Sequence, residues 1–408
     1  MSPARAKHAR LSRGRTLFSS GFCSGLFCPA DLYANRSQTP LHVIQYRLDL
    51  HRIPELGREL PKTLAYLRSV LDPLRCKLSS PIPGSLCAFF DFGRDHAIAF
   101  RADCDALPVT EASGAPYASQ HPGRMHACGH DAHMAMVLDL AVWLDGQTDL
   151  PNNVLLVFQP AEETVGGARD LCRSGVFEEY GVECIFGMHL WPEVPSGIIA
   201  SRKKELMIHS CEVNVDITGK PIHIVRSQYG IDALAAAVEF YRKCAELEAS
   251  VPDELGHLLK FGKLESGAAR NVVSGHAHLL GSMRAFRDEV YQALLDGMDE
   301  IGRQVEDSFG CSVTVTTSDG YPTVYNPPDL FDRVRACGID FLILDEPVMI
   351  AEDFSWYQRH LPGMFFFLGT GPSPALHAND FHFDENILQT GADFWKALAA
   401  HYKGGTHP

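Results

Sequence analysis

The sequence lacks the features that would assign it to a membrane, secreted or nucleic-acid-binding class. It has no run of eighteen apolar residues, since the longest such stretch, Met134 to Leu144, is interrupted by Asp139, and we expect no transmembrane helix. Its twelve cysteines form no CxxC pair and follow no convincing secretory signal, which favours a cytoplasmic protein. It lacks an excess of positive charge: the formal net charge is -14, which disfavours nucleic acid and anionic membrane as partners. Small molecules are the expected ligands.

Length and composition predict a folded protein of two domains. The chain has 408 residues, of which 46% are hydrophobic and 21% are charged, and domains usually have about 100 to 200 residues. Residues 1–40 differ from the rest: five basic residues precede the first acid, Asp31. We interpret them as a disordered or mis-started N-terminal extension, with an organellar transit segment as the alternative.

The pattern after Leu41 predicts an α/β fold with a mixed central sheet flanked by helices. Four short apolar runs are typical of strands buried on both faces: Ala97 to Arg101, Val154 to Phe158, Cys184 to Gly187 and Met364 to Leu368. Residues 206–317 differ. They predict strands at 209–218, 258–264, 277–283 and 312–317 and helices at 231–247 and 288–307. That βαββαβ order indicates an inserted ferredoxin-like sandwich, so 41–205 and 318–408 would form the catalytic domain.

Polar clusters follow each of the four predicted strands. The ends of parallel strands meet at one edge of a sheet, where ligands bind in open α/β folds, so we expect these clusters to converge. A fifth cluster opens the buried helix that runs to Leu144, where Gly129 bends the chain between Cys128 and His130. The clusters are Arg101-Ala-Asp103-Cys-Asp105, Gln159-Pro-Ala-Glu162-Glu163, Met188-His189, Leu376-His377 and His126-Ala-Cys128-Gly-His130-Asp131-Ala-His133.

Cysteine, histidine and glutamate supply the sulfur, nitrogen and oxygen donors that zinc and related divalent ions prefer. Each residue alone is more often structural: an isolated cysteine is usually a small buried hydrophobe, and an isolated histidine usually belongs to the core or the surface. Five potential ligands at strand ends and one helix entrance favour a metal site over coincidence.

Six motifs resemble those of the hippurate hydrolase, N-acyl-amino-acid amidohydrolase and indole-acetyl-amino-acid hydrolase family of co-catalytic metallopeptidases. They occur in the order of that family from about His42 to the C-terminus. The motifs are Arg101-Ala-Asp-Cys-Asp-Ala-Leu-Pro108, His126-Ala-Cys-Gly-His-Asp131, Phe158-Gln-Pro-Ala-Glu-Glu163, Gly187-Met-His189, Gly281-Ser-Met-Arg-Ala-Phe286 and Ala351-Glu-Asp-Phe354.

The resemblance implies a site with two divalent metal ions (Zn, Mn, Ni or Co). It assigns Glu162 as the general base that deprotonates water, and Asp105 as the acid that orients ligands without binding metal. It assigns five metal ligands, with the thiolate bridging both ions: Cys128, His130, Glu163, His189 and His377.

The resemblance also implies roles for three residues of the insert. His223 would stabilise the oxyanion across a homodimer interface, and Asn271 and Arg284 would hold the substrate carboxylate, a task that suits the planar guanidinium. Ile-Val-Arg-Ser after His223, and Ser-Gly after Asn271-Val-Val, depart from the family pattern and put the geometry of this loop in doubt.

The expected activity is hydrolysis of the amide bond of an N-acyl amino acid to a carboxylate and a free amino acid. A dipeptidase or carboxypeptidase that uses the same residues remains an alternative. So does a metal-binding dimeric scaffold without catalysis, although the intact base and ligand set disfavour it.

Overall fold

The apolar runs form a mixed eight-stranded sheet. The computed structural model describes residues 42–164 and 166–404, so the extension predicted for 1–40 lies outside the described residues. The strand order is β1-β2-β4-β3-β5-β16-β6-β15. The strands are β1 (Lys77–Ser79), β2 (Leu86–Phe90), β3 (Ala97–Asp103), β4 (Asn153–Gln159), β5 (Val182–Trp191), β6 (Ile199–Ser201), β15 (Leu342–Ile343) and β16 (Gly363–Gly369).

Four neighbouring strands of this sheet, β4, β3, β5 and β16, run parallel. The flanking strands β2 and β6 pair antiparallel with them. The carboxyl ends of the four parallel strands therefore share one edge of the sheet, as the sequence predicts. The expected α/β fold with a mixed central sheet is confirmed.

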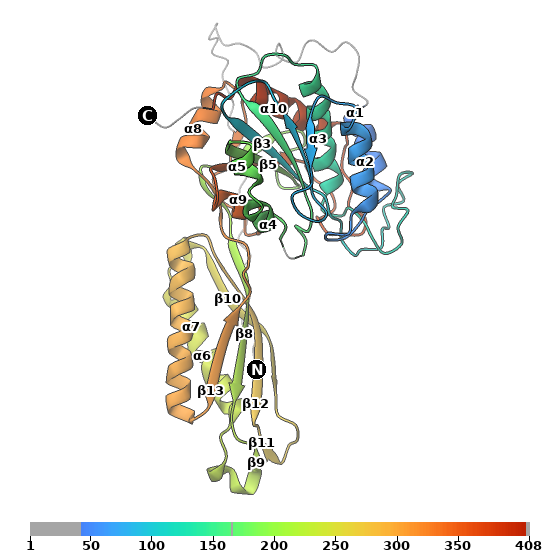
Figure 1. Cartoon of the computed structure of the whole chain (residues 1–408). Coiled ribbons are helices and arrows are strands. Elements are labelled where there is room, and N and C mark those ends of the chain that lie inside the picture. The colour runs from blue at the N-terminus through green and yellow to red at the C-terminus, as the bar shows by residue number, and fades with distance from the viewer. Residues whose placement is uncertain (1–41, 165, 405–408) are drawn as a thin grey trace, which may run out of the picture. The chain divides into compact units, whose positions relative to one another are not determined.

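Helices cover both faces of the sheet because alternate strand residues point to opposite sides. In β3, Ile98 and Phe100 join one hydrophobic cluster and Ala99 joins the other. The first face carries α1 (His42–His51), α2 (Pro61–Leu71), α3 (His130–Asp145), α8 (Pro328–Ala336) and α10 (Ile387–His401). The second carries α4 (Ala168–Arg173), α5 (Val176–Glu179) and α9 (Ser355–Gln358); Figure 1 shows both layers.

None of the helices within 42–164 and 166–404 combines the length and apolar character needed to cross a bilayer.

A second, antiparallel sheet has the order β10-β12-β8-β13. Alternate residues of β8, including Val213 and Val215, are buried beneath the helices α6 and α7. The element order is βαββαβ, that of a ferredoxin-like sandwich. The elements are β8 (His209–Thr218), α6 (Ala233–Ser250), β10 (His257–Ser266), β12 (His276–Ala285), α7 (Asp288–Phe309) and β13 (Ser312–Thr317), with a short 3-10 helix at Asp253–Leu255.

The chain enters and leaves this insert through two paired strands, β7 (Lys204–Met207) and β14 (Val324–Asn326). At the opposite end of β8, beyond Thr218, β9 (Ile222–His223) pairs with β11 (Val272–Val273). A 3-10 helix, Ile224–Tyr229, follows β9. Because a strand rises about 3.3 Å per residue, β8 places β9 and β11 about 30 Å from the point of entry.

Candidate metal centre

Four segments bring the predicted ligands together at the carboxyl edge of the large sheet. Cys128 and His130 lie at the entrance to α3, Glu163 follows β4, and His377 lies in the loop after β16. His189 differs from the expectation that it follows a strand, because β5 continues to Trp191 and His189 lies within it. The four predicted clusters thus converge, although they do not all begin where a strand ends.

The donor atoms of these residues have the spacing of ligands around metal ions. Cys128 Sγ lies 3.3 Å from His189 Nε2 and 3.2 Å from His377 Nε2. Glu163 Oε1 lies 3.3 Å from His377 Nε2 and 3.8 Å from His130 Nε2. Tetrahedral ligands at metal distances of about 2.0–2.3 Å are separated from each other by about 3.3–3.8 Å. Cys128 and Glu163 thus each lie within 3.8 Å of two of the histidines.

The backbone fixes which nitrogen of two histidines faces the cluster. His130 Nδ1 lies 2.8 Å from the carbonyl oxygen of Asp105, and His189 Nδ1 lies 2.7 Å from that of Leu190. A carbonyl oxygen only accepts, so Nδ1 carries the proton in both rings and Nε2 presents its lone pair. Burial lowers the pKa of His189 to about 3 and also lowers that of His130. Both rings are therefore neutral, as metal ligands must be.

Unsatisfied buried atoms show that the residues present fit metal ions. His130 Nε2 is buried, and no atom of the described residues makes a hydrogen bond with it. Glu163 Oε1 is also buried and has only imidazole nitrogens at ion-pair distance among the described residues, those of His377 at 3.3 Å and His130 at 3.8 Å. Burial, followed by the charges of Glu163 and Glu162, raises the pKa of the Cys128 thiol, so a thiolate there needs neighbouring cations. Two overlapping sets of donor atoms, each within 4.8 Å of one another, share Glu163: Cys128, Glu163, His377 and His130, Glu162, Glu163.

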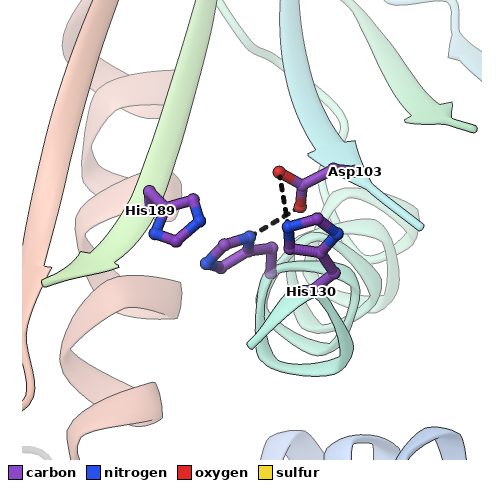
Figure 2. A group of neighbouring side chains, drawn as sticks. Asp103, His130 and His189 are labelled. Atoms are coloured by element: carbon purple, nitrogen blue, oxygen red, sulfur yellow. Dashed lines mark hydrogen bonds and ion pairs between the residues drawn. The ribbon is translucent and has the colours of Figure 1, made fainter. Parts of the chain in front are cut away.

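His133 completes a third group of donor atoms, with Asp103, His130 and His189, but both of its nitrogens are already used. Nδ1 donates to Asp103 Oδ1 at 2.6 Å, and Nε2 accepts from the amide of Leu190 at 3.1 Å. His133 is therefore a positioning residue, since it joins β3 and β5 behind the cluster. Figure 2 shows Asp103, His130 and His189 facing one another from β3, α3 and β5.

Asp105 holds the loop that carries both glutamates. Its carboxylate accepts from the amides of Glu162 at 2.9 Å and Glu163 at 3.3 Å, and its carbonyl oxygen orients His130. Burial raises the pKa of Asp105 to about 8 even though the Glu162 amide donates to it. Asp105 thus contacts the backbone of both glutamates and the ring of one histidine, and its orienting role stays a prediction.

Arg101 balances a group of buried acids beside Glu162. Its guanidinium donates to Asp103 at 2.8 Å, to Glu352 at 2.9 Å and to Asp353 at 2.8 Å. Burial nonetheless raises the pKa of Glu352 to about 8. It also raises the pKa of Glu162, with the charges of Glu352 and Glu163 adding to the effect. Arg101 and Glu352 both belong to the sequence motifs, but the motifs predict no role for either. The signal that could have identified Arg101 is its charge within a largely apolar strand.

Two residues of the site have backbone conformations that non-glycine residues rarely adopt. Ala161, next to Glu162, has φ +62°, and His377 has φ +69°, and such conformations often occur at functional sites. Gly129 has φ +85°, and a Cβ there would lie 2.7 Å from Leu190 Cδ1. Glycine is therefore required at this position both by the positive φ and by the close approach of Leu190.

The cluster opens into a cleft of about 530 Å³. Cys128, Glu162, Glu163, His189 and His377 line its polar part. Its other walls are largely apolar and contain no lysine or arginine from the described residues. They consist of Trp191, Pro192, Glu193, Met207, Ile350, Ala351, Glu352, Ser373, Ala375 and Leu376.

The three predicted residues of the insert do not gather with this cluster. His223 and Asn271 lie together beyond Thr218, where Ile224 N donates to Asn271 O at 3.0 Å. His223 is exposed, and its Nδ1 accepts from Val225 N at 3.4 Å. Arg284, at the other end of the insert, donates to the carbonyl oxygen of Met349 at 2.7 Å, next to Ile350 of the cleft.

This fold and this site place the chain among the metal-dependent hydrolases. The chain belongs to peptidase family M20/M25/M40, whose model matches residues 99–401.

Individual proteins resemble the chain over nearly its whole length. An uncharacterised hydrolase of Staphylococcus aureus (strain bovine RF122 / ET3-1) is 32% identical over 375 residues, which cover 88% of this chain and 98% of that protein. The Bacillus subtilis YXEP protein, a dinuclear metal-binding peptidase of the M20 family, has a similar structure, with a TM-score of 0.77 and 29% identity over 88% of this chain and 96% of that one. The aminobenzoyl-glutamate utilization protein of Klebsiella pneumoniae shares the fold, with a TM-score of 0.63 and 20% identity over 88% of this chain and 96% of that one.

Proposed function

We propose that the chain is an aminoacylase of the hippurate hydrolase type, which hydrolyses the amide bond of N-acetyl, N-benzoyl or similar N-acyl amino acids. The products are a carboxylate and a free amino acid. Glu162 takes a proton from the attacking water and passes it to the leaving amine. Two divalent ions, Zn, Mn, Ni or Co, would be held by Cys128, His130, Glu163, His189 and His377. When bound, such ions would lower the pKa of the attacking water and polarise the scissile carbonyl.

One observation carries the proposal: the expected base lies beside the expected ligands, four of which line the same cleft as the base. Donor atoms of Glu162, Glu163 and His130 lie within 4.8 Å of one another. A carboxylate at that position is within reach of a water bound at the metal centre and can accept its proton. The apolar walls, which include Trp191 and Met207, suit an acyl or aryl group.

We further propose that a second copy of the chain completes the site. Leu234, Val238 and Tyr241 form an exposed apolar stripe on α6, with exposed fractions of 44%, 54% and 49%, at the spacing of one helix face. His223 lies in β9, beyond the far end of β8, too far from the metal centre to act within its own chain, so it would serve the partner. Arg284 and the partner's Asn271 would hold the substrate carboxylate.

Substrate screening tests the activity. Chelator-stripped protein given back zinc, manganese, nickel or cobalt singly is assayed on N-acetyl and N-benzoyl amino acids and on dipeptides. Faster release of the free amino acid from the N-acyl compounds supports the proposal, and preference for dipeptides favours the peptidase alternative. No turnover with any metal favours the inactive scaffold.

Glu162→Gln tests the base. The amide keeps the shape of the side chain but accepts no proton at neutral pH, so kcat should fall by about 10²–10⁴-fold while the metal content stays that of the wild type. Turnover near that of the wild type would refute the assignment.

Complementation tests the shared site. Glu162→Gln and His223→Ala should each be inactive alone. Mixed and reassociated, they should regain activity, because one site of the heterodimer keeps both residues. Continued inactivity of a dimer that light scattering shows to be mixed would contradict a role for His223 across the interface.

A further inference from the structure

The backbone of Glu162 is held from both sides by side chains. Its amide donates to Asp105 Oδ1 at 2.9 Å, and its carbonyl oxygen accepts from the hydroxyl of Tyr321 at 2.7 Å. The preceding residue, Ala161, has φ +62°, a conformation that surrounding contacts must maintain. The direction of the Glu162 side chain therefore depends on both of these hydrogen bonds.

Tyr321 lies in the segment that returns from the insert to the large sheet, between β13 and β14. Its backbone exchanges two hydrogen bonds with Ser210 near the start of β8, each 3.0 Å long. Gly320 has φ +59°, and a Cβ there would lie 2.2 Å from the carbonyl oxygen of Ser210. Tyr321 is thus fixed to the first strand of the insert.

The ring of Tyr321 also packs on the glutamate loop. A Cβ at Gly166 would lie 3.1 Å from Tyr321 Cε1, and Gly166 N closes the loop on Ala161 O at 2.9 Å. Burial, with the charges of Asp353 and Glu162 nearby, raises the pKa of the phenol, so its hydroxyl remains a donor. One side chain therefore touches the loop at both of its ends.

We propose that Tyr321 is a positioning residue that couples the start of the insert to the general base. Its backbone moves with β8, and its hydroxyl fixes the carbonyl group of Glu162. A shift of the insert is transmitted to Glu162 through Tyr321. The catalytic consequence rests on the proposed function, because it requires Glu162 to be the base.

Tyr321→Phe isolates the hydroxyl while keeping the ring. We expect kcat to fall about tenfold, because small misplacements of a catalytic group cost rates of this order or more, with KM and metal content unchanged. Amide hydrogen exchange at Glu162 and Gly166 should become faster. Tyr325→Phe, in the exposed part of β14, is the matched control and should change none of these quantities.

A merely structural role predicts a different result. If Tyr321→Phe loses metal in proportion to its activity, or keeps kcat within twofold of the wild type with unchanged exchange, the proposal is wrong. Gly320→Ala supplies the second arm, since it displaces the backbone pairing with Ser210. Its effect on kcat and that of Tyr321→Phe should be less than additive in the double variant. Additive effects would show that the two ends of the connection act independently.

The exchange measurement separates this proposal from the proposed function. If the wild type hydrolyses none of the N-acyl amino acids but Tyr321→Phe still accelerates exchange at Glu162, the substrate assignment fails and the coupling stands. If the wild type is active and neither kcat nor exchange responds, the coupling fails and the substrate assignment stands.

Discussion

Replacement of Arg101 by methionine should destabilise the fold more than the same replacement of an exposed arginine. The guanidinium is 1% exposed and donates to three buried carboxylates, those of Asp103, Glu352 and Asp353, and to Gln159. Methionine fills a similar volume but supplies no charge, so the acids keep their burial and lose their counter-ion.

The expected loss follows from the cost of leaving buried charges unpaired. Removing one partner of a buried ion pair costs about 3–5 kcal/mol. For a domain of 150–250 residues, each kcal/mol lowers Tm by about 2–4 °C, so Tm should fall by about 6–20 °C. Calorimetry or denaturant unfolding of chelated protein measures the change without a contribution from bound metal.

The loss of stability in Arg101→Met should also depend on pH. Burial raises the pKa of Glu352 to about 8 and the charge of Arg101 opposes that rise, so in Arg101→Met the folded pKa of Glu352 should lie still further above its unfolded value. The contribution of this carboxyl is then favourable below the unfolded pKa and is lost as pH rises through the folded pKa. The deficit relative to the wild type should therefore be smaller in mild acid than in mild alkali. Arg58→Met is the control, because Arg58 is partly exposed beside Asp170 and such pairs contribute about 0–1 kcal/mol. Equal losses in the two variants would refute the reasoning.

Two further predictions concern Asp105 and Glu111. Asp105→Ala removes the acceptor for the amides of Glu162 and Glu163, so the free energy of unfolding should fall by roughly 2–4 kcal/mol and kcat should fall with it, as denaturation and steady-state assays will show. Burial alone would raise the pKa of Glu111, but hydrogen bonds from His51, Ser113 and the Ser119 amide outweigh it and lower the pKa to about 2. The stabilisation by Glu111 is then complete above its ordinary pKa of 4.5 and is lost as pH falls toward 2. In Glu111→Gln the free energy of unfolding should therefore fall less steeply with decreasing pH in this range. An unchanged slope would contradict this.

The strands of the large sheet are predictable because their apolar runs are short and continuous. Each expected run lies inside an observed strand, and the prediction fails at the ends, where backbone pairing continues past the last apolar residue. His189 illustrates this: β5 carries two more residues beyond it, so a polar residue did not mark the end of a strand. In the insert, His209–Thr218 and Ser312–Thr317 have their expected bounds, because alternating burial gives these strands a clear period.

The metal centre is partly predictable for a topological reason. Parallel strands deliver the segments that follow them to one edge, so Glu163 and His377 meet although more than two hundred residues separate them. The residues that support the site were not predictable in this way. Arg101 finds Glu352 251 residues later, and Tyr321 reaches Glu162 159 residues back. These contacts depend on how loops cross at the sheet edge, which local patterns do not encode.

Metal stoichiometry tests the central claim most directly. Elemental analysis of reconstituted wild-type protein should give two equivalents of divalent metal per chain. Cys128→Ala should be strongly depleted, because Cys128 Sγ lies 3.3 Å from His189 Nε2 and 3.2 Å from His377 Nε2 and is proposed to bind both ions. Cys172→Ala, at a cysteine of the α4 face, should keep both equivalents. Retention of two full equivalents by Cys128→Ala would contradict a shared thiolate, and a wild type that binds no metal would contradict the whole account.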